Sequence, residues 1–263
     1  MPEGDTLRRA AHRVGEVLAN EELIDFWARK LRGHRPRAGQ RIGSVEARGK
    51  NLLIGFDNGL TLRTHLGMSG SWRTRAVETH PAALQHDPRL SLRLSTRLGH
   101  ALCYSAPVVE THVTDDEPVA LRRLGPDLAD VPPDVDAAVA RARELADPGT
   151  MLCDLLLDQS VAAGIGNAIK SEALFVAGFS PFRSLDTLDD QGLARLYGTA
   201  ARLLAQNSRP GSGPRASTVD GRLFVYDRFR QPCRRCTTPV ERSYRGTSAR
   251  STYHCPRCQH PVR

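Results

Sequence analysis

Lysine is scarce in this basic sequence. Of its 263 residues, 37 are Lys or Arg and 29 are Asp or Glu, giving a formal net charge of +8, but only three of the basic residues are lysines: Lys30, Lys50 and Lys170. An excess of positive charge favours a polyanionic partner, most often nucleic acid. Because arginine supplies nearly all of that charge, each lysine is a candidate for a specific role.

Long apolar runs and an export signal are also absent. No run of about 18 apolar residues occurs, which argues against a transmembrane helix and a membrane partner. The first residues are acidic and polar, so no secretory signal is visible. We therefore expect a cytoplasmic protein, associated with the nucleoid if it is bacterial, in which disulfide bonds do not form.

The first half of the chain is expected to be a mostly antiparallel β domain led by one helix. Apolar residues recur at helical spacing from Asp5 to Ala19. Short β runs follow at residues 42–48, 51–56, 60–65, 90–94 and 101–104, and Asp57-Asn58-Gly59 is a strong hairpin turn between two of them.

Helical patterns dominate after a stretch rich in Asp and Pro near residues 128–133. These helices are expected at residues 135–145, 150–157, 167–176 and 188–206. The chain is long enough for two domains and a small third. We expect a multi-domain α+β fold with domains at residues 1–128, 129–215 and 222–263.

The cysteines give the most specific local signal. Cys233 and Cys236 form one Cys-x-x-Cys pair, and Cys255 and Cys258 form a second pair near the end of the chain. Two such pairs joined by a β-hairpin complete a tetrahedral all-thiolate site, which is typical of one structural zinc ion. Arginines between the pairs favour a hairpin that enters a nucleic-acid groove; a ribbon that only packs or binds protein is the alternative.

The first residues offer an amine and a carboxylic acid side by side. If Met1 is removed, the chain begins with the secondary amine of Pro2, next to Glu3. An α-amine has a pKa near 7.7–8.0, so its unprotonated fraction at pH 7 exceeds that of a lysine by roughly 300- to 500-fold. Such an amine can form a cationic Schiff base, and the acid can protonate a leaving oxygen. A proline at position 2 is nevertheless common.

Three further segments are candidates for DNA contact. Gly164-Ile165-Gly166-Asn167 is a tight turn at a helix start, where Asn167 could cap the helix and backbone amides suit a phosphate. Lys50 lies in the turn Arg48-Gly49-Lys50-Asn51 between two strands. Met68 lies in a Gly/Ser-rich loop, where an exposed Met could enter a base stack. An ordinary helix turn, a solvated lysine and a buried methionine are the respective alternatives.

These segments in this order resemble the formamidopyrimidine-DNA glycosylase/endonuclease VIII family of base-excision repair enzymes. The resemblance spans nearly the whole chain and also includes Leu124-Gly125-Pro126-Asp127. It implies an N-terminal β-sandwich with a leading helix, a helix–two-turn–helix domain and a C-terminal zinc finger built on a β-hairpin. It further implies a monomer that binds damaged DNA and acts as a bifunctional glycosylase and AP lyase.

The resemblance also implies roles for individual residues. Pro2 would attack C1′ of the damaged nucleotide, Glu3 would be the general acid/base, and Lys50 would act at β-elimination. Arg250 would contact the phosphate expelled by δ-elimination. Arg123 and Asn167 would bind other phosphates around the flipped nucleotide. Met68 would fill part of the space that this nucleotide leaves.

Two features favour the endonuclease VIII branch and hence oxidised pyrimidines. The Asp-Pro-Arg-Arg-Phe-Gly stretch of the formamidopyrimidine branch is missing after the strand that ends at Tyr104, and Ser160 stands where that branch has a lysine. The loop from His65 to Ser71 is closer to the formamidopyrimidine branch, so oxidised purines are an alternative substrate. A zinc-ribbon DNA-binding protein without catalysis is the alternative from another class.

Overall fold

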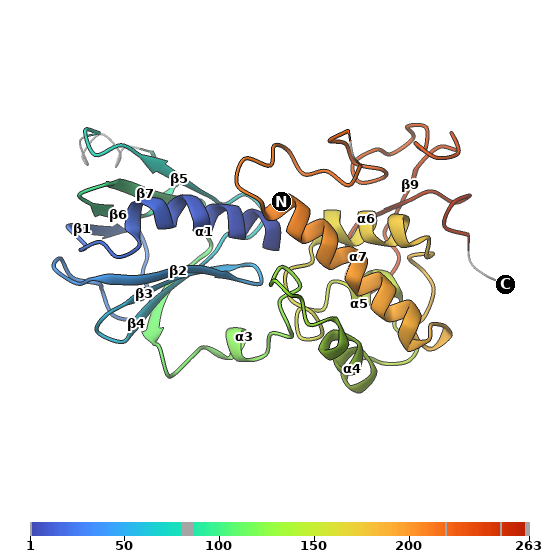
Figure 1. Cartoon of the computed structure of the whole chain (residues 1–263), viewed down its shortest axis with the longest axis horizontal. Helices are drawn as coiled ribbons and strands as arrows, with labels where there is room; N and C mark the ends of the chain where they lie inside the picture. Colours follow the sequence, from blue (N-terminus) through green and yellow to red (C-terminus); the bar gives the residue numbers. More distant parts are fainter. Residues whose placement is uncertain (1, 80–86, 219, 248, 261–263) are drawn as a thin grey trace. The chain divides into compact units, whose positions relative to one another are not determined.

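The computed structural model describes residues 2–79, 87–218, 220–247 and 249–260. The chain forms two compact units, Met1–Arg122 and Arg123–Arg263 (Figure 1). In the described part of the chain, no helix is both long enough and apolar enough to cross a membrane. Each unit has its own hydrophobic core.

The first unit is a sandwich of two antiparallel four-stranded sheets. One sheet has the strand order β1-β6-β7-β5 and the other β2-β3-β4-β8 (Figure 1). The strands are β1 (Asp25–Ala28), β2 (Ile42–Arg48), β3 (Asn51–Phe56), β4 (Leu60–His65), β5 (Ser71–Arg75), β6 (Leu90–Thr96), β7 (Gly99–Tyr104) and β8 (Val108–Val113). The short helix α3 (Val119–Arg122) ends this unit.

Helix α1 (Gly4–Leu18) closes one side of the sandwich. It packs against β2 and β5, which are edge strands of the two sheets. Its buried apolar residues recur every three or four positions and share one core with both sheets, which is the amphipathic pattern of a helix that covers a core. This packing fixes the start of α1 on the sandwich.

Residues 29–32 close the opposite side of the sandwich, between the edge strands β1 and β8. The Arg29 amide donates to the Ser91 carbonyl at 2.9 Å, and the Arg32 amide donates to the Val109 carbonyl at 3.1 Å. The segment thus leaves one sheet and joins the other within four residues.

The second unit is helical and ends in a β-hairpin that carries the four cysteines. Its helices are α4 (Val135–Leu145), α5 (Leu152–Leu155), α6 (Asn167–Ala177), the 3-10 helix η1 (Leu185–Thr187) and α7 (Asp190–Ser208). The hairpin pairs β9 (Glu241–Ser243) with β10 (Thr252–His254). One core lies among the helices, and a smaller core joins Phe175 of α6 to Val225, Val240, Tyr253 and the cysteines.

The predicted fold class is confirmed: a β-sandwich with a leading helix, a helical region and a cysteine-bearing hairpin. One predicted helix, at residues 150–157, is wrong. Only Leu152–Leu155 are helical, because the start of that segment pairs with residues 183–185: the Leu185 amide donates to the Thr150 carbonyl and the Leu152 amide to the Arg183 carbonyl, both at 2.9 Å. The division into domains at 1–128, 129–215 and 222–263 stays a prediction.

Candidate functional site

Pro2 and Glu3 lie at the start of α1, held by the helix itself. Glu3 is the N-cap residue, is fully buried, and accepts the amides of Thr6 and Leu7 on its carbonyl at 2.9 and 3.1 Å. Its side chain makes no capping hydrogen bond. Pro2 is half-buried, and the predicted loss of Met1 concerns a residue outside the described part. A carboxyl group is therefore held on a rigid element beside residue 2.

Lys50 lies in the braced turn between β2 and β3. Asn51 donates from Nδ2 to the Arg48 carbonyl at 3.1 Å and accepts from Arg63 Nε at 3.0 Å. Arg63 in turn forms an ion pair with Glu110 of β8. This chain of contacts ties the Lys50 turn to three neighbouring strands of one sheet, so the lysine is presented from a rigid support.

Met68 lies on the loop from β4 to β5 and is exposed, with 68% of its surface accessible. The loop is tight because the Gly70 amide donates to the Leu66 carbonyl at 2.9 Å, and a Cβ on Gly70 would lie 2.4 Å from that oxygen. Leu66 and Trp72 on either side are buried. Of the two alternatives for Met68, the structure has the exposed one.

Asn167 is the first residue of α6, and it does not cap that helix. The N-cap is Gly166, because the Asn167 side chain is turned to the cysteine hairpin: Nδ2 donates to Ser251 Oγ at 3.2 Å, and Oδ1 accepts from Lys170 Nζ at 2.7 Å. The predicted capping role is therefore wrong. Asn167 is nearly buried, at 4% exposure.

Lys170 links Asn167 to the strand that follows Arg250. Its side chain is fully buried, and besides Asn167 its Nζ donates to the Ser251 carbonyl at 3.2 Å and to Thr252 Oγ1 at 2.8 Å. A buried ammonium requires such partners, since desolvating an unpaired charge is costly. Arg250 is exposed and directly precedes the two residues that Lys170 holds.

Replacing Lys170 with Met is expected to lower the free energy of unfolding by about 2–3 kcal/mol, because it leaves buried acceptors without a donor. We also expect faster hydrogen exchange of the Ser251 and Thr252 amides. Thermal unfolding and exchange mass spectrometry measure both effects. Lys30→Met, at an exposed lysine, is the matched control and should behave as wild type; equal stability of the two variants would contradict this role for Lys170.

Arg123 is exposed and precedes the Leu124-Gly125-Pro126-Asp127 motif. The Gly125 amide donates to the Gln159 carbonyl at 2.9 Å, and a Cβ on Gly125 would lie 2.3 Å from the Val161 carbonyl oxygen. The motif thus packs directly on the turn that leads to Asn167. This close approach explains why a glycine stands at position 125.

The four cysteines form a cluster that can hold a metal ion. All four Sγ atoms lie within 4.8 Å of one another, with Cys233 and Cys258 at 3.9 Å and Cys236 and Cys255 at 3.4 Å. Four thiolates around a zinc ion with Zn–S bonds of 2.3 Å would be about 3.8 Å apart. The Arg235 and Cys258 amides donate to sulfur, each at 3.4 Å. The donor set therefore fits a tetrahedral thiolate site.

Glu172 is a buried carboxylate for which the sequence predicted no role. It is 1% exposed, and it accepts the amides of Phe224, Val225 and Tyr226 at 2.7–2.8 Å together with the Ser217 hydroxyl. It fixes the segment that leads from α7 to the cysteines onto α6. The sequence signal for this role is an acidic residue within the apolar stretch of α6, where a buried carboxylate needs hydrogen-bond donors.

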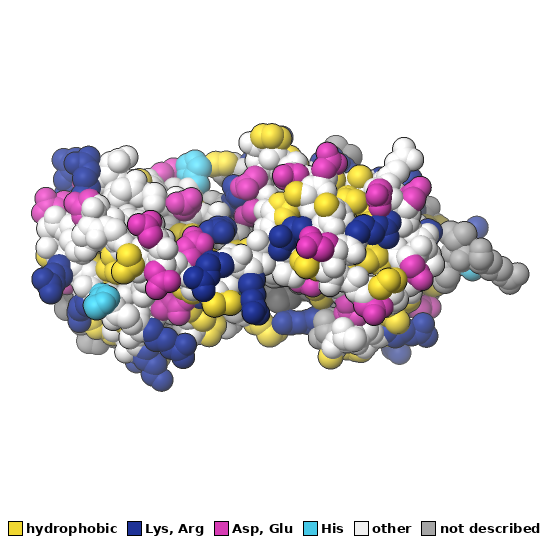
Figure 2. Space-filling model, turned by 90° about the horizontal axis from the view of Figure 1, so that it is seen from below, with side chains coloured by type: hydrophobic (Ala, Val, Ile, Leu, Met, Phe, Trp, Pro, Cys, Tyr) yellow, Lys and Arg dark blue, Asp and Glu magenta, His cyan; other side chains and the backbone are white. Residues whose placement is uncertain are grey.

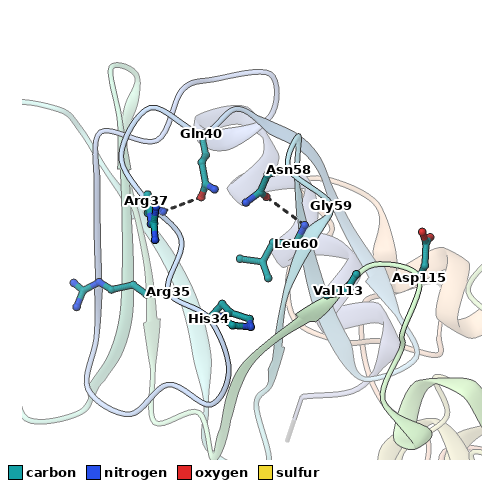
Figure 3. Close-up of a pocket in the computed structure, with 9 residues that line it drawn as sticks. All are labelled: His34, Arg35, Arg37, Gln40, Asn58, Gly59, Leu60, Val113 and Asp115. Atoms are coloured by element: carbon teal, nitrogen blue, oxygen red, sulfur yellow. Dashed lines mark hydrogen bonds between the residues drawn. The ribbon is translucent and has the colours of Figure 1, made fainter.

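A cavity of about 550 Å³ lies at the Leu60 end of β4 and the Val113 end of β8 (Figure 3). Arg35 points away from it, and a carboxylate, Asp115, is part of its lining (Figure 3). Gln40 accepts from the Arg37 amide at 2.8 Å, so this polar group already has a partner. None of the residues with a predicted role lines this cavity.

Lys and Arg side chains are spread over both units among Asp and Glu on the face shown in Figure 2. The residues with predicted roles also divide between the units. The first unit holds Pro2, Glu3, Lys50 and Met68; the second holds Arg123, Asn167, Arg250 and the four cysteines.

The chain is similar to known proteins over nearly its whole length. Residues 1–107 match the model of the formamidopyrimidine-DNA glycosylase N-terminal domain, and residues 124–215 match the model of the H2TH domain of the same glycosylase. A probable endonuclease 8 of Streptomyces coelicolor is 38% identical, covering 98% of this chain and 94% of that protein. An endonuclease 8 of Klebsiella pneumoniae is 34% identical, covering 99% and 100%.

Solved structures agree with these matches. The MutM (FPG) protein of Thermus thermophilus is 29% identical, with a TM-score of 0.80 over all of both chains. A mutant FPG of Lactococcus lactis, in complex with DNA containing Fapy-dG, has a TM-score of 0.82 at 21% identity, over 99% of this chain and all of that one, which shows the shared fold. The chain therefore belongs to the formamidopyrimidine-DNA glycosylase/endonuclease VIII family.

Proposed function

We propose that this protein is a base-excision-repair DNA glycosylase and AP lyase that removes oxidised pyrimidines through an amine at Pro2. The observation that carries the proposal is the pair at the start of α1: Pro2 half-buried, followed by a fully buried Glu3 on a rigid helix. Family membership supplies the chemistry that such a pair performs. Its relatives carry the name endonuclease 8.

In this mechanism the Pro2 nitrogen bonds to C1′ of the damaged nucleotide, and the bond from C1′ to the base breaks. The base leaves with that electron pair and takes up the proton that the Pro2 nitrogen loses. Glu3 protonates the ring oxygen, the sugar opens, and a cationic Schiff base remains. Loss of a proton from C2′ then expels the 3′ phosphate, and a second elimination expels the 5′ phosphate.

The other predicted residues serve these steps. Lys50, on its braced turn, assists β-elimination and holds a phosphate; Arg250 contacts the phosphate that leaves in δ-elimination. Asn167 and Arg123 bind phosphates around the flipped nucleotide, since chemistry at C1′ requires the nucleotide to leave the stack. Met68, exposed on a tight loop, enters the vacated space.

The cysteine cluster holds one zinc ion in this proposal, and the protein works as a monomer. An all-thiolate tetrahedral set is typical of structural zinc. The ion supplies stability to the hairpin rather than chemistry, because four protein ligands leave no position open. Cys233, Cys236, Cys255 and Cys258 would hold it.

The preference for pyrimidines rests on residue 160 and the missing Arg-Arg stretch. Ser160 makes its hydrogen bonds within its own turn: its amide and hydroxyl both donate to Asp158 Oδ1, at 2.8 and 2.6 Å. This position therefore offers a lesion no cation. Oxidised purines are the alternative substrate, favoured by the loop from His65 to Ser71.

The decisive test is borohydride trapping on duplexes that contain 5-hydroxyuracil, 8-oxoguanine or an abasic site. We expect covalent adducts with 5-hydroxyuracil and with the abasic site, and slower reaction with 8-oxoguanine. Glu3→Gln should reduce adduct formation on 5-hydroxyuracil by about 10²- to 10⁴-fold, as loss of a general acid does. The loss should be smaller on the abasic duplex, because the sugar of an abasic site is a hemiacetal that already opens to the aldehyde without this acid.

Each result of this test has one meaning. Faster reaction with 8-oxoguanine than with 5-hydroxyuracil would reverse the assigned preference. Absence of any adduct on the abasic duplex would leave a DNA-binding protein without lyase chemistry. Equal activity of Glu3→Gln and wild type on all three duplexes would remove Glu3 from the mechanism.

A further inference from the structure

Lys30, which has no role in the proposed mechanism, lines a cationic pocket on the first unit. The pocket has a volume of about 300 Å³. Its lining combines three cations with a wall of small and apolar residues: Arg29, Lys30, Arg32, Ser91, Ala106, Pro107, Val108 and Val109. The cations all come from the segment that crosses from β1 to β8.

Backbone hydrogen bonds fix the segment that carries these cations, and the Arg29 side chain makes further contacts. The Arg29 amide donates to the Ser91 carbonyl, and the Arg32 amide donates to the Val109 carbonyl, so both ends of the four-residue segment are fixed to a sheet. The Arg29 guanidinium donates from Nε to the Leu90 carbonyl at 3.0 Å and lies 5.8 Å from the Trp27 ring centre. The backbone thus brings three exposed cationic residues to one pocket, and the Arg29 side chain is held there by its own contacts.

The lining of this pocket contains no carboxylate. Within the described residues, Arg29, Lys30 and Arg32 form no ion pair. Glu110, which follows the lining residue Val109 in the chain, forms its ion pair with Arg63. Three uncompensated cations around one hollow favour an anion, because like charges held together repel one another until a counter-charge arrives. The cavity in Figure 3 differs in this respect, since Asp115 lines it.

The pocket adjoins the loop that carries Met68. Pro107 of the pocket wall lies 3.0 Å from the position a Cβ on Gly67 would take, and Val108 pairs with His65 in the β4–β8 ladder. The pocket is therefore at the end of β4 where the Met68 loop begins. The cavity of Figure 3 lies at the opposite end of the same two strands, beside Leu60 and Val113.

From these observations we propose that the pocket formed by residues 29–32 and 106–109 binds a backbone phosphate of DNA next to Met68. The chemistry that the pocket recognises is a phosphate group, and its place beside the Met68 loop assigns that group to nucleic acid rather than to a small phosphorylated molecule. The inference rests on the proposed function for its DNA, but it needs neither Pro2 chemistry nor a lesion.

The test uses the scarcity of lysine. In protein labelled with ¹³C at lysine Cε, the three lysines give three signals, assigned through Lys30→Gln. We expect undamaged duplex DNA to shift the Lys30 signal. In fluorescence anisotropy, Lys30→Gln should weaken DNA binding and reduce the slope of log K against log salt by about 1, the effect of losing one phosphate contact.

Arg37→Gln is the matched control. Arg37 lies in the same connection between β1 and β2 as Lys30, and the substitution also removes one positive charge. Arg37 lines the cavity at the other end of β4 and β8. The slope of log K against log salt should therefore stay as in wild type. Borohydride trapping of abasic DNA by the wild-type protein tests the Pro2 mechanism separately. A wild-type protein that forms no adduct would contradict that mechanism, whereas the comparison of salt slopes on undamaged DNA would still test the phosphate site.

Two outcomes would overturn the phosphate site. One is a salt slope in Lys30→Gln equal to that of Arg37→Gln. The other is a Lys30 signal that moves with pyrophosphate but not with DNA, which would assign the pocket to a small phosphorylated ligand instead.

Discussion

Extra residues in front of Pro2 are expected to abolish covalent capture of abasic DNA, by about 10³-fold or more, as removal of a catalytic nucleophile does. The reason is that the Pro2 nitrogen becomes a tertiary amide, which has no free lone pair to attack C1′. The same protein should regain full trapping when a protease removes the extension and frees the Pro2 amine. Borohydride trapping before and after cleavage measures the effect in one preparation.

The extension must leave DNA binding intact for this result to identify the nucleophile. Affinity for undamaged duplex, measured by anisotropy, is the control and should change little, since phosphate contacts dominate it. Wild-type trapping by the extended protein would exclude Pro2 and direct attention to Lys50, the half-buried lysine of the same unit.

Removal of the proposed zinc ion is expected to unfold the hairpin that carries Arg250 while the β-sandwich stays folded. The strands β9 and β10 have three residues each, and such a hairpin is marginal without further support. Structural zinc supplies about 10–16 kcal/mol of binding energy to small thiolate sites. Cys233→Ser or a strong chelator should therefore increase hydrogen exchange across residues 233–258 and lower δ-elimination more than β-elimination.

The two tryptophans of the chain provide an internal control for this experiment. Trp27 and Trp72 both lie in the first unit, so their fluorescence should not change when the hairpin unfolds. Cys103→Ser, at a buried cysteine of β7 outside the cluster, should retain one metal ion per chain. A wild-type protein that binds no metal, or a Cys233→Ser variant with unchanged exchange, would contradict the proposal.

Local sequence patterns predicted the elements whose signals are local. The bounds of β2, β3, β4 and α4 agree with the predicted ranges, because short β runs, a strong Asp-Asn-Gly turn and a helical period are signals that act within one segment. The short strands β1, β5 and β8 were not located individually, since their edges depend on pairing with strands distant in sequence. The same dependence shortened the helix expected at residues 150–157.

The features of the candidate site also fall into those that local sequence determines and those that depend on contacts between distant segments. The sequence by itself determined that Pro2 and Glu3 are neighbours, that the four cysteines form two Cys-x-x-Cys pairs, and that lysine occurs at only three positions. Only the tertiary structure decided that Glu3 is buried, that Lys170 rather than a helix cap holds Asn167, and that Lys30 joins two arginines in one pocket. Covalent neighbours and short spacings are properties of the chain, whereas burial and convergence of charge arise when distant segments pack together.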